Sequence, residues 1–192
     1  MDRQEGAVQN TKSKSVLGAF EWVESIVFAL VFVIVIFSFL FRIVVVEGPS
    51  MQPTLEGGDR LILSTLFFDP QPGDIVVIAK TGANDDNKPI IKRVIATEGQ
   101  TVDIDFEAGI VTVDGEELNE PYINELTNRK YEVDFPLTVD EGCYFVMGDN
   151  RNHSADSRTT KYGQIKRGEI TGEVIFRIYP FDKAGRDFGS MQ

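Results

Sequence analysis

A serine in a conformationally restricted segment is the first residue of this sequence whose setting suggests catalysis. Ser50 lies in VEGPSMQPTLEGGD, residues 46–59, and it is the only hydroxyl between Gly48, Pro49 and Pro53. Proline fixes its own φ and glycine permits backbone angles that other residues avoid, so the segment predicts a tight, preset turn. A serine hydroxyl is a weak nucleophile on its own and needs a general base to take its proton. A base within reach of Ser50 is therefore the second requirement.

The sequence offers two candidate bases. His153, the only histidine, lies among polar residues in GDNRNHSADSR, residues 148–158, and leaves a Ser-His-Asp triad open. Lys92 lies among isoleucine and valine in PIIKRVIA, with Arg93 beside it. A lysine in apolar surroundings or near another cation loses its proton more readily, so we favour a Ser-Lys pair. In a strand, Lys92 and Arg93 point to opposite faces, so one of them points inward if the other points outward. The pattern alone leaves open the alternative in which Lys92 faces solvent and Arg93 forms a surface ion pair.

Composition argues against two other classes of site. The 192 residues carry 19 Lys and Arg against 30 Asp and Glu, a net charge of −11, whereas a nucleic-acid binder needs a basic surface. One cysteine, Cys143, and one histidine leave too few ligands for a Cys/His zinc site. The acids Asp85 and Asp86 in KTGANDDNKP, residues 80–89, predict the tip of a hairpin and not a calcium loop, because the EF-hand spacing is absent. Asp103, Asp105 and Glu107 alternate as on the solvent face of a strand.

An apolar stretch near the N-terminus predicts a membrane anchor. Residues 1–46 have no net charge, and Ser25–Phe41 contains no charged residue. Seventeen helical residues span roughly 25 Å, slightly less than the ~30 Å hydrocarbon core, so Trp22 and Val23 at one end and the stem of Arg42 at the other must complete the span. We therefore expect a cytoplasmic segment over residues 1–24, an anchor over 25–46 and an extracytoplasmic domain over 47–192, in a plasma membrane crossed once. The alternative, a cleavable signal peptide, is not favoured because no small-x-small site follows.

The sequence after the anchor predicts an all-β domain. Short β-branched runs alternate with clusters of Gly, Pro, Asn and Asp, which predicts many short strands in an antiparallel, barrel-like sheet. These runs are RLILST near 60, DIVVIA near 74, PIIKRVIA near 89, TVDID near 101, GIVTV near 109, KYEVDF near 130, CYFVM near 143 and EVIFRIY near 173. The run Leu66, Phe67 and Phe68 is apolar for a connection, and either dips into the lipid interface or packs inside.

Four motifs in order resemble one known family. GPSMQPTL, GDIVVI, KRVIATEGQTV and GDNRNHSADSR follow the anchor in this sequence. The combination is similar to the type I signal peptidases, in the short form common in Gram-positive bacteria, from the anchor to about Arg158 and more weakly beyond. Each motif alone is modest, but their order behind an N-terminal anchor is specific.

The resemblance implies a role for each matching residue. Ser50 would be the nucleophile, Lys92 its general base and Ser154 the residue that hydrogen-bonds and orients Lys92. Asp156 and Arg158 would form a structural ion pair beneath the site, and Asp149 with Arg151 would hold the same loop. The resemblance implies no metal and no organic cofactor.

The resemblance also implies the substrate and how it binds. Preproteins carrying a signal peptide would add a β-strand between the segments before the nucleophile and before the lysine, with shallow pockets that accept Ala-x-Ala. Here the residues matching those walls are Val45, Val46, Met51, Ile90 and Ile91.

This sequence departs from the family pattern at three positions. In some members a hydroxyl two residues before the nucleophile donates to the oxyanion together with the Ser50 N–H, but here that position is Gly48. A missing donor can cost on the order of 3 kcal/mol of transition-state stabilisation. Ala96 and Glu98 stand where many relatives have Gly and Pro, in a turn where we expect little chemical effect.

Two other functions share part of this pattern. A self-cleaving repressor uses a Ser-Lys pair on a β-rich domain, but it should carry a basic DNA-binding domain where this chain has an apolar anchor. An inactive relative acting as a binding module should have lost Ser50 or Lys92, and both are present. The favoured function is therefore a membrane-bound serine endopeptidase that removes signal peptides.

Overall fold

The computed structural model describes residues 3–66, 68–81 and 88–189, with side chains from residue 20 onward. The chain divides into two compact units, Met1–Leu40 and Phe41–Gln192. Each unit is described by itself below. The tip of the hairpin predicted around Asp85 and Asp86, and Phe67 of the apolar run, lie outside the described residues.

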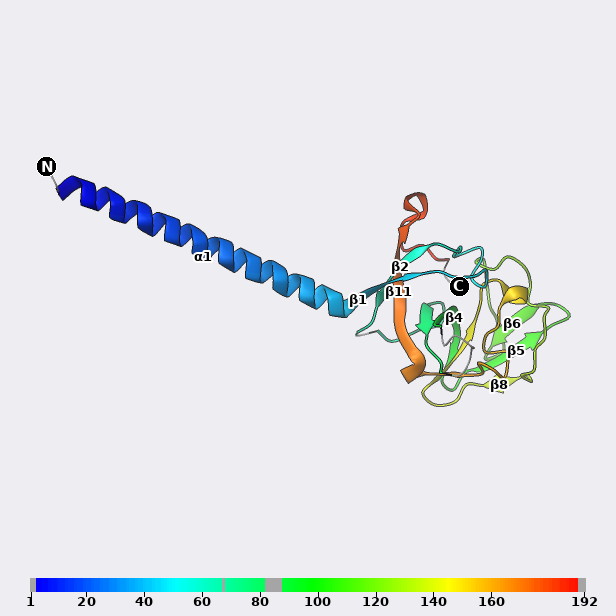
Figure 1. Cartoon of the computed structure of the whole chain (residues 1–192). Helices are drawn as coiled ribbons and strands as arrows, with labels where there is room; N and C mark the ends of the chain where they lie inside the picture. The colour runs from blue at the N-terminus through cyan, green and yellow to red at the C-terminus, as the bar shows by residue number, and fades with distance from the viewer. Residues whose placement is uncertain (1–2, 67, 82–87, 190–192) are drawn as a thin grey trace. The chain divides into compact units, whose positions relative to one another are not determined.

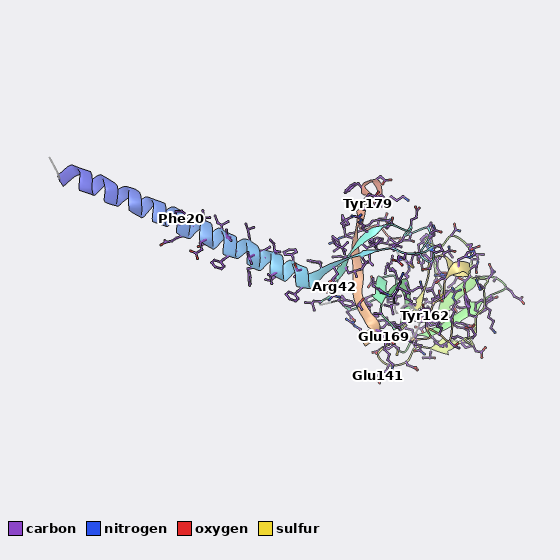
Figure 2. All side chains as sticks on the ribbon, in the orientation of Figure 1. Phe20, Arg42, Glu141, Tyr162, Glu169 and Tyr179 are labelled. Carbon is purple, nitrogen blue, oxygen red and sulfur yellow. The ribbon has the colours of Figure 1, made fainter. Side chains whose placement is uncertain are left out.

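The first unit is one helix, α1 (Arg3–Leu40). Its segment Phe20–Leu40 has 21 residues with a mean hydropathy of 2.8 and no buried part. Figure 2 shows side chains projecting all around this segment. At ~1.5 Å per residue it is about 32 Å long, so by length and composition it could cross a bilayer. Ser25 and Ser38 donate their hydroxyl protons to the carbonyls four residues earlier, which satisfies both hydroxyls inside the helix.

The helix ends six residues before Val46, the predicted end of the anchor. The anchor was predicted to extend over residues 41–46, but Phe41–Val45 form strand β1. All five residues pair with strand β2 (Arg60–Ser64), and Arg42 is exposed. A short apolar run fits a strand as well as a helix, and only the presence of a pairing partner distinguishes them. Residues 41–46 therefore belong to the second unit.

Two antiparallel sheets build the second unit, as the sequence predicted. The larger sheet, curled into a half-barrel, has the order β1, β2, β11 (Ile170–Tyr179), β3 (Ile75–Ile78), β4 (Ile90–Thr97), β9 (Cys143–Met147) and β10 (Ile165–Lys166). The smaller sheet has the order β7 (Glu116–Glu117), β6 (Ile110–Val113), β5 (Thr101–Asp105) and β8 (Leu137–Thr138). Figure 1 shows β11 crossing beside β2, with β5, β6 and β8 together on the opposite side of β4. Short 3₁₀ turns occur at Arg151–His153, Arg167–Glu169 and Phe181–Lys183.

Seven of the eight predicted strands are present, and the prediction of a strand at KYEVDF is wrong. Residues 130–135 form a loop. The ring of Phe135 packs edge-on against Phe106 and Phe145, and Tyr131 lies under the guanidinium of Arg158. The alternation that suggested a strand thus serves to anchor a loop through its aromatic side chains.

Three clusters of buried side chains hold strand β4 from several directions. One cluster contains buried side chains of both sheets, among them Ile95 and Phe145 of the larger sheet and Val102 of the smaller sheet. A second contains Val76 and Val94, and the partly buried Phe68 packs against it, whereas Leu66 of the same apolar run is exposed. The third includes residues of the turn that carries Ser50. Because β4 is covered on both faces, polar side chains on either face are buried.

Candidate active site

Ser50 lies in a turn that buried apolar side chains fix to the larger sheet. The ends of the turn are joined where the Val46 N–H donates to the Asp59 carbonyl at 2.9 Å. Met51 and Leu55 follow Ser50, are 1% and 0% exposed, and pack in the third core cluster. The tight turn predicted from glycine and proline is present, and Ser50 has a fixed position at its start.

Lys92 and Ser50 are in direct contact. Lys92 lies within β4, where its side chain is 3% exposed. Its Nζ donates to Ser50 Oγ at 2.8 Å and to the Ile91 carbonyl at 2.9 Å. Arg93 is fully buried on the opposite face of the strand. The alternative in which Lys92 faces solvent and Arg93 forms a surface pair is therefore wrong.

Burial lowers the pKa of Lys92 from 10.5 to about 8, because desolvation disfavours the ammonium form. The carboxylates of Asp156 and Asp149 act against this shift, and the guanidinium of Arg158 adds to it. A neutral lysine amine has a lone pair that can accept a proton from Ser50 Oγ. The site therefore places a serine hydroxyl next to an amine that is partly neutral near physiological pH, an arrangement that can support proton transfer between them.

His153 has a different environment. Its side chain is 67% exposed, and its Nε2 lies 3.9 Å from a carboxylate oxygen of Glu125. The side-chain partner of Ser50 among the described residues is Lys92. A Ser-His-Asp triad is not formed.

Ser154 and the predicted ion pair are connected to one another and lie close to the turn that carries Ser50. Asp156 and Arg158 form the expected buried pair, with Arg158 Nε 2.9 Å from Asp156 Oδ1. Ser154 Oγ donates to Asp156 Oδ2 at 2.7 Å, and Gly148 N–H donates to the same oxygen at 3.0 Å. These donors and Arg158 keep the pKa of Asp156 low despite its burial. In the described residues Lys92 bonds to Ser50 and Ile91 and not to Ser154, so the lysine-orienting role of Ser154 stays a prediction.

Asp149 and Arg151 are held by partners that the sequence did not indicate. Asp149 receives two hydrogen bonds from Arg93, at 2.9 and 2.7 Å, and also a hydrogen bond from Thr54 in the nucleophile turn. Arg151 is paired with Glu120, which lies 31 residues earlier. Both residues do fix the 148–158 loop, but through separate ion pairs and not with each other.

Gly148 lies at a close contact that the sequence did not indicate. A Cβ added there would lie 2.3 Å from Ser154 Oγ and 2.4 Å from the Ser50 carbonyl oxygen. No side chain fits, because the nucleophile turn and the 148–158 loop touch at this point. The signal in the sequence was glycine at the start of GDNRNHSADSR, which a sequence reading takes as an ordinary turn residue.

The backbone around Ser50 is open to an oxyanion. Gly48 has a φ of 77°, which L side chains rarely adopt, and nothing lies within 4 Å of the position of its missing Cβ. Among the described residues the Ser50 N–H has no hydrogen-bond acceptor. Within the described part of the chain, one backbone donor is therefore free at Ser50, and Gly48 adds no side-chain donor.

A cavity of about 340 Å³ opens beside the two candidate catalytic residues. It lies between the segment before Ser50 and the segment before Lys92, the two walls that the resemblance implied. An exposed ion pair between Glu47 and Lys88, at 3.3 Å, bridges these walls. The lining includes all five predicted substrate-binding residues: Val45, Val46, Met51, Ile90 and Ile91.

Comparisons with known proteins identify the family to which this chain belongs. A sequence profile of the family described as signal peptidase, peptidase S26, matches residues 19–179. Signal peptidase I of Bacillus licheniformis is 37% identical over 185 residues, which cover 91% of this chain and 95% of that protein. Signal peptidase I S of Bacillus subtilis (strain 168) is 34% identical over 186 residues, with coverages of 90% and 94%. A crystal structure of a signal peptidase I from Enterococcus faecalis V583 has 32% identity and a TM-score of 0.44, covering 55% of this chain and 97% of that one. Because the profile and the relatives match along most of its length, this chain belongs to the S26 family of signal peptidases and is a serine protease.

Proposed function

We propose that this protein is a membrane-anchored type I signal peptidase that cleaves signal peptides from exported preproteins with a Ser50-Lys92 dyad. The observation that carries the proposal is the 2.8 Å contact between Ser50 Oγ and the buried amine of Lys92. Family membership supports the cleavage of signal peptides in general. The dyad, the acyl-enzyme and the sequence preference are the finer parts of the proposal.

In the first half-reaction the neutral Lys92 amine takes the proton of Ser50 Oγ while the oxygen attacks the scissile carbonyl carbon. The tetrahedral oxyanion is received by the Ser50 N–H, for which the described residues provide no other acceptor. Collapse of the intermediate breaks the C–N bond, and Lys92 passes its proton to the leaving amine. The mature protein departs, and the signal peptide stays as an ester on Ser50.

In the second half-reaction Lys92 takes a proton from a water molecule, which attacks the ester carbonyl. The intermediate collapses, Ser50 Oγ regains a proton from Lys92, and the signal peptide leaves with a new carboxylate. Asp156 and Arg158 form no hydrogen bond with the amine in the described residues and act on it through their charges, Asp156 raising and Arg158 lowering the pKa of Lys92.

The substrate is proposed to bind as an extended strand along the cavity of about 340 Å³. Backbone hydrogen bonds to the two walls would align it, and the buried side chains of Val46 and Met51 would limit the depth available to its residues. Such shallow pockets favour small side chains, which agrees with an Ala-x-Ala preference.

We propose that α1 crosses the plasma membrane once, with the N-terminus in the cytoplasm and the catalytic domain outside. The apolar surface of Phe20–Leu40 is fully exposed and requires a lipid environment. Residues 47–192 carry 15 basic and 26 acidic side chains, a charge that anionic headgroups repel. The helix, and not charge, would therefore hold the domain at the membrane.

The direct test is cleavage of a preprotein whose signal ends in Ala-x-Ala by the detergent-solubilised protein. Ser50→Ala and Lys92→Ala should each lower kcat by about 10³-fold or more, because neither residue can act without the other. Ser50→Ala should keep the wild-type melting profile within a few degrees, and Lys92→Ala should show a cooperative unfolding transition, so that loss of activity is not loss of folding. Cleavage that persists in either variant would show that the dyad is assigned wrongly.

The pH dependence gives a second test. Only the neutral form of Lys92 can accept the serine proton, and its pKa is lowered to about 8. We therefore expect kcat/KM to rise about tenfold per pH unit below pH 8 and to level off above it. Initial rates between pH 6 and pH 10 measure the profile. A midpoint near 6, where a histidine titrates, would contradict a lysine base.

A further inference from the structure

Asn150 contacts the nucleophile turn with both its backbone and its side chain. Its N–H donates to the Ser50 carbonyl at 3.1 Å, and its side-chain Nδ2 donates to the Pro49 carbonyl at 3.1 Å. The residue is 7% exposed, and its buried Oδ1 has no hydrogen-bond partner among the described residues. The side chain of Asn150 therefore acts on this turn only through its donor end.

The orientation of the Asn150 amide follows from the chemistry of its partner. A proline carbonyl can only accept hydrogen bonds, so the group that faces it must be the –NH₂. The flipped amide would place Oδ1 against the Pro49 oxygen, and two acceptors would repel each other. The contact is thus a hydrogen bond from Asn150 to Pro49.

The Pro49 carbonyl and the Ser50 N–H belong to one planar peptide group. In a trans peptide these two groups point in opposite directions, so a hydrogen bond that fixes the carbonyl also fixes the direction of the N–H. Within the turn, the Gln52 N–H also donates to the Pro49 carbonyl, at 3.1 Å. Among the residues that the structure describes, Asn150 is the one donor from outside the turn, and it connects the peptide plane to the 148–158 loop.

We infer that Asn150 is a positioning residue for the oxyanion hole: it holds the Pro49–Ser50 peptide so that the Ser50 N–H points at the developing oxyanion. This inference rests on the proposed function of Ser50 as nucleophile. Donation to a carbonyl also polarises the peptide group, which makes the N–H at its other end a stronger donor. Gly48 provides no side-chain hydroxyl as a second oxyanion donor. Stabilisation of the oxyanion therefore depends more strongly on the orientation of the Ser50 N–H than it would if a second donor were present.

A merely structural role for Asn150 predicts a different result. A residue that only ties two loops together would change stability, or change the binding of substrates and inhibitors alike. A residue that aims an oxyanion donor acts on tetrahedral species and leaves binding of the planar substrate unchanged. The two roles are separated by comparing a peptide aldehyde, which forms a tetrahedral adduct with Ser50, with the matching peptide amide, which binds without reacting.

The experiment uses the full-length, detergent-solubilised protein with Asn150→Leu, which keeps the side-chain shape and removes the donor. The matched control is Asn152→Leu in the same loop. Asn152 accepts from the Arg129 N–H at 2.9 Å and donates to the Leu126 carbonyl at 3.0 Å, away from the nucleophile turn. The measurements are kcat, KM, the inhibition constants of an Ala-x-Ala peptide aldehyde and its amide, and the pH profile.

For Asn150→Leu we expect kcat to fall by about 10- to 100-fold, with KM changed less than about twofold. The inhibition constant of the aldehyde should rise by a similar factor of about 10 to 100, whereas that of the amide stays constant. The midpoint of the pH profile should remain near 8, because the Lys92 environment is unchanged. Asn152→Leu should lower the melting temperature and leave both inhibition constants in place.

The inference is overturned if kcat of Asn150→Leu stays within about twofold of the wild type, or if both inhibitors weaken equally. Should Asn150→Leu not fold, Asn150→Asp replaces the –NH₂ by an acceptor oxygen and is judged by the same ratio of inhibition constants. Ser50→Ala, measured in parallel, separates the two proposals. Cleavage by Ser50→Ala would refute the dyad itself, whereas inactive Ser50→Ala beside fully active Asn150→Leu would refute only the positioning role.

Discussion

Exchange of Lys92 for methionine should abolish cleavage and, at pH 7, make the protein more stable by roughly 3 kcal/mol. The loss of activity follows from removing the base. The gain in stability follows from the burial of Lys92, whose pKa falls from 10.5 to about 8 in the folded protein. Methionine has a similar length and fills the same space with no charge to desolvate.

The gain should depend on pH in a defined direction. Below pH 8 Lys92 is protonated in both the folded and the unfolded chain, and the folded state carries the full cost of the buried charge. Between pH 8 and 10.5 the folded state releases its proton while the unfolded state keeps it, so the wild type becomes more stable as pH rises. At pH 10.5 most of the advantage of methionine should be gone.

Denaturant unfolding of the full-length protein in detergent, at pH 7 and pH 10, measures this difference. Lys130→Met is the matched control, because Lys130 is 61% exposed and should show no such pH-dependent gain. If Lys92→Met is less stable than the wild type at pH 7, or if its advantage is equal at both pH values, the lowered lysine pKa is refuted.

Replacing Gly148 with alanine should lower kcat/KM by about 10²-fold or more and destabilise the fold by roughly 1–3 kcal/mol. The new methyl group would lie 2.4 Å from the Ser50 carbonyl oxygen and 2.3 Å from Ser154 Oγ. Ser154 cannot rotate away freely, because it is 2% exposed and bonded to Asp156. The nucleophile turn must therefore move, and with it the Ser50 oxygen that faces Lys92.

Cleavage rates and thermal unfolding of Gly148→Ala test this prediction. Gly168→Ala is the control, since nothing lies within 4 Å of a Cβ at that glycine and its φ is not in the left-handed region. Wild-type activity in Gly148→Ala would mean that the contact between the 148–158 loop and the nucleophile turn is looser than the structure has it.

Several features could be predicted from the sequence because they depend on local patterns. The apolar helix needs only a run of residues such as Phe20–Leu40, and seven strands follow from β-branched runs between turn residues. The residue pattern favoured Lys92 over His153 as the partner of Ser50, and the resemblance to the signal peptidases assigned the pair that the structure places in contact. The strand Phe41–Val45 and the loop 130–135 were missed, because a short apolar or alternating run does not reveal whether a partner strand is available.

The partners of the buried charges were decided by the tertiary structure alone. Arg93 pairs with Asp149, which is 56 residues away in the sequence, and Arg151 pairs with Glu120, which is 31 residues away. No rule of sequence spacing predicts such pairs. The pKa of Lys92 likewise depends on which side chains cover it. The environments of Gly148 and Asn150 likewise arise only where the 148–158 loop meets the turn that carries Ser50. At Gly148 there is no room for a methyl group, and Asn150 donates a hydrogen bond that holds the Pro49–Ser50 peptide plane. The sequence by itself thus determined which groups could react, since side-chain chemistry is local. Only folding decided their burial, partners and orientation, because these arise where segments far apart in the chain pack together.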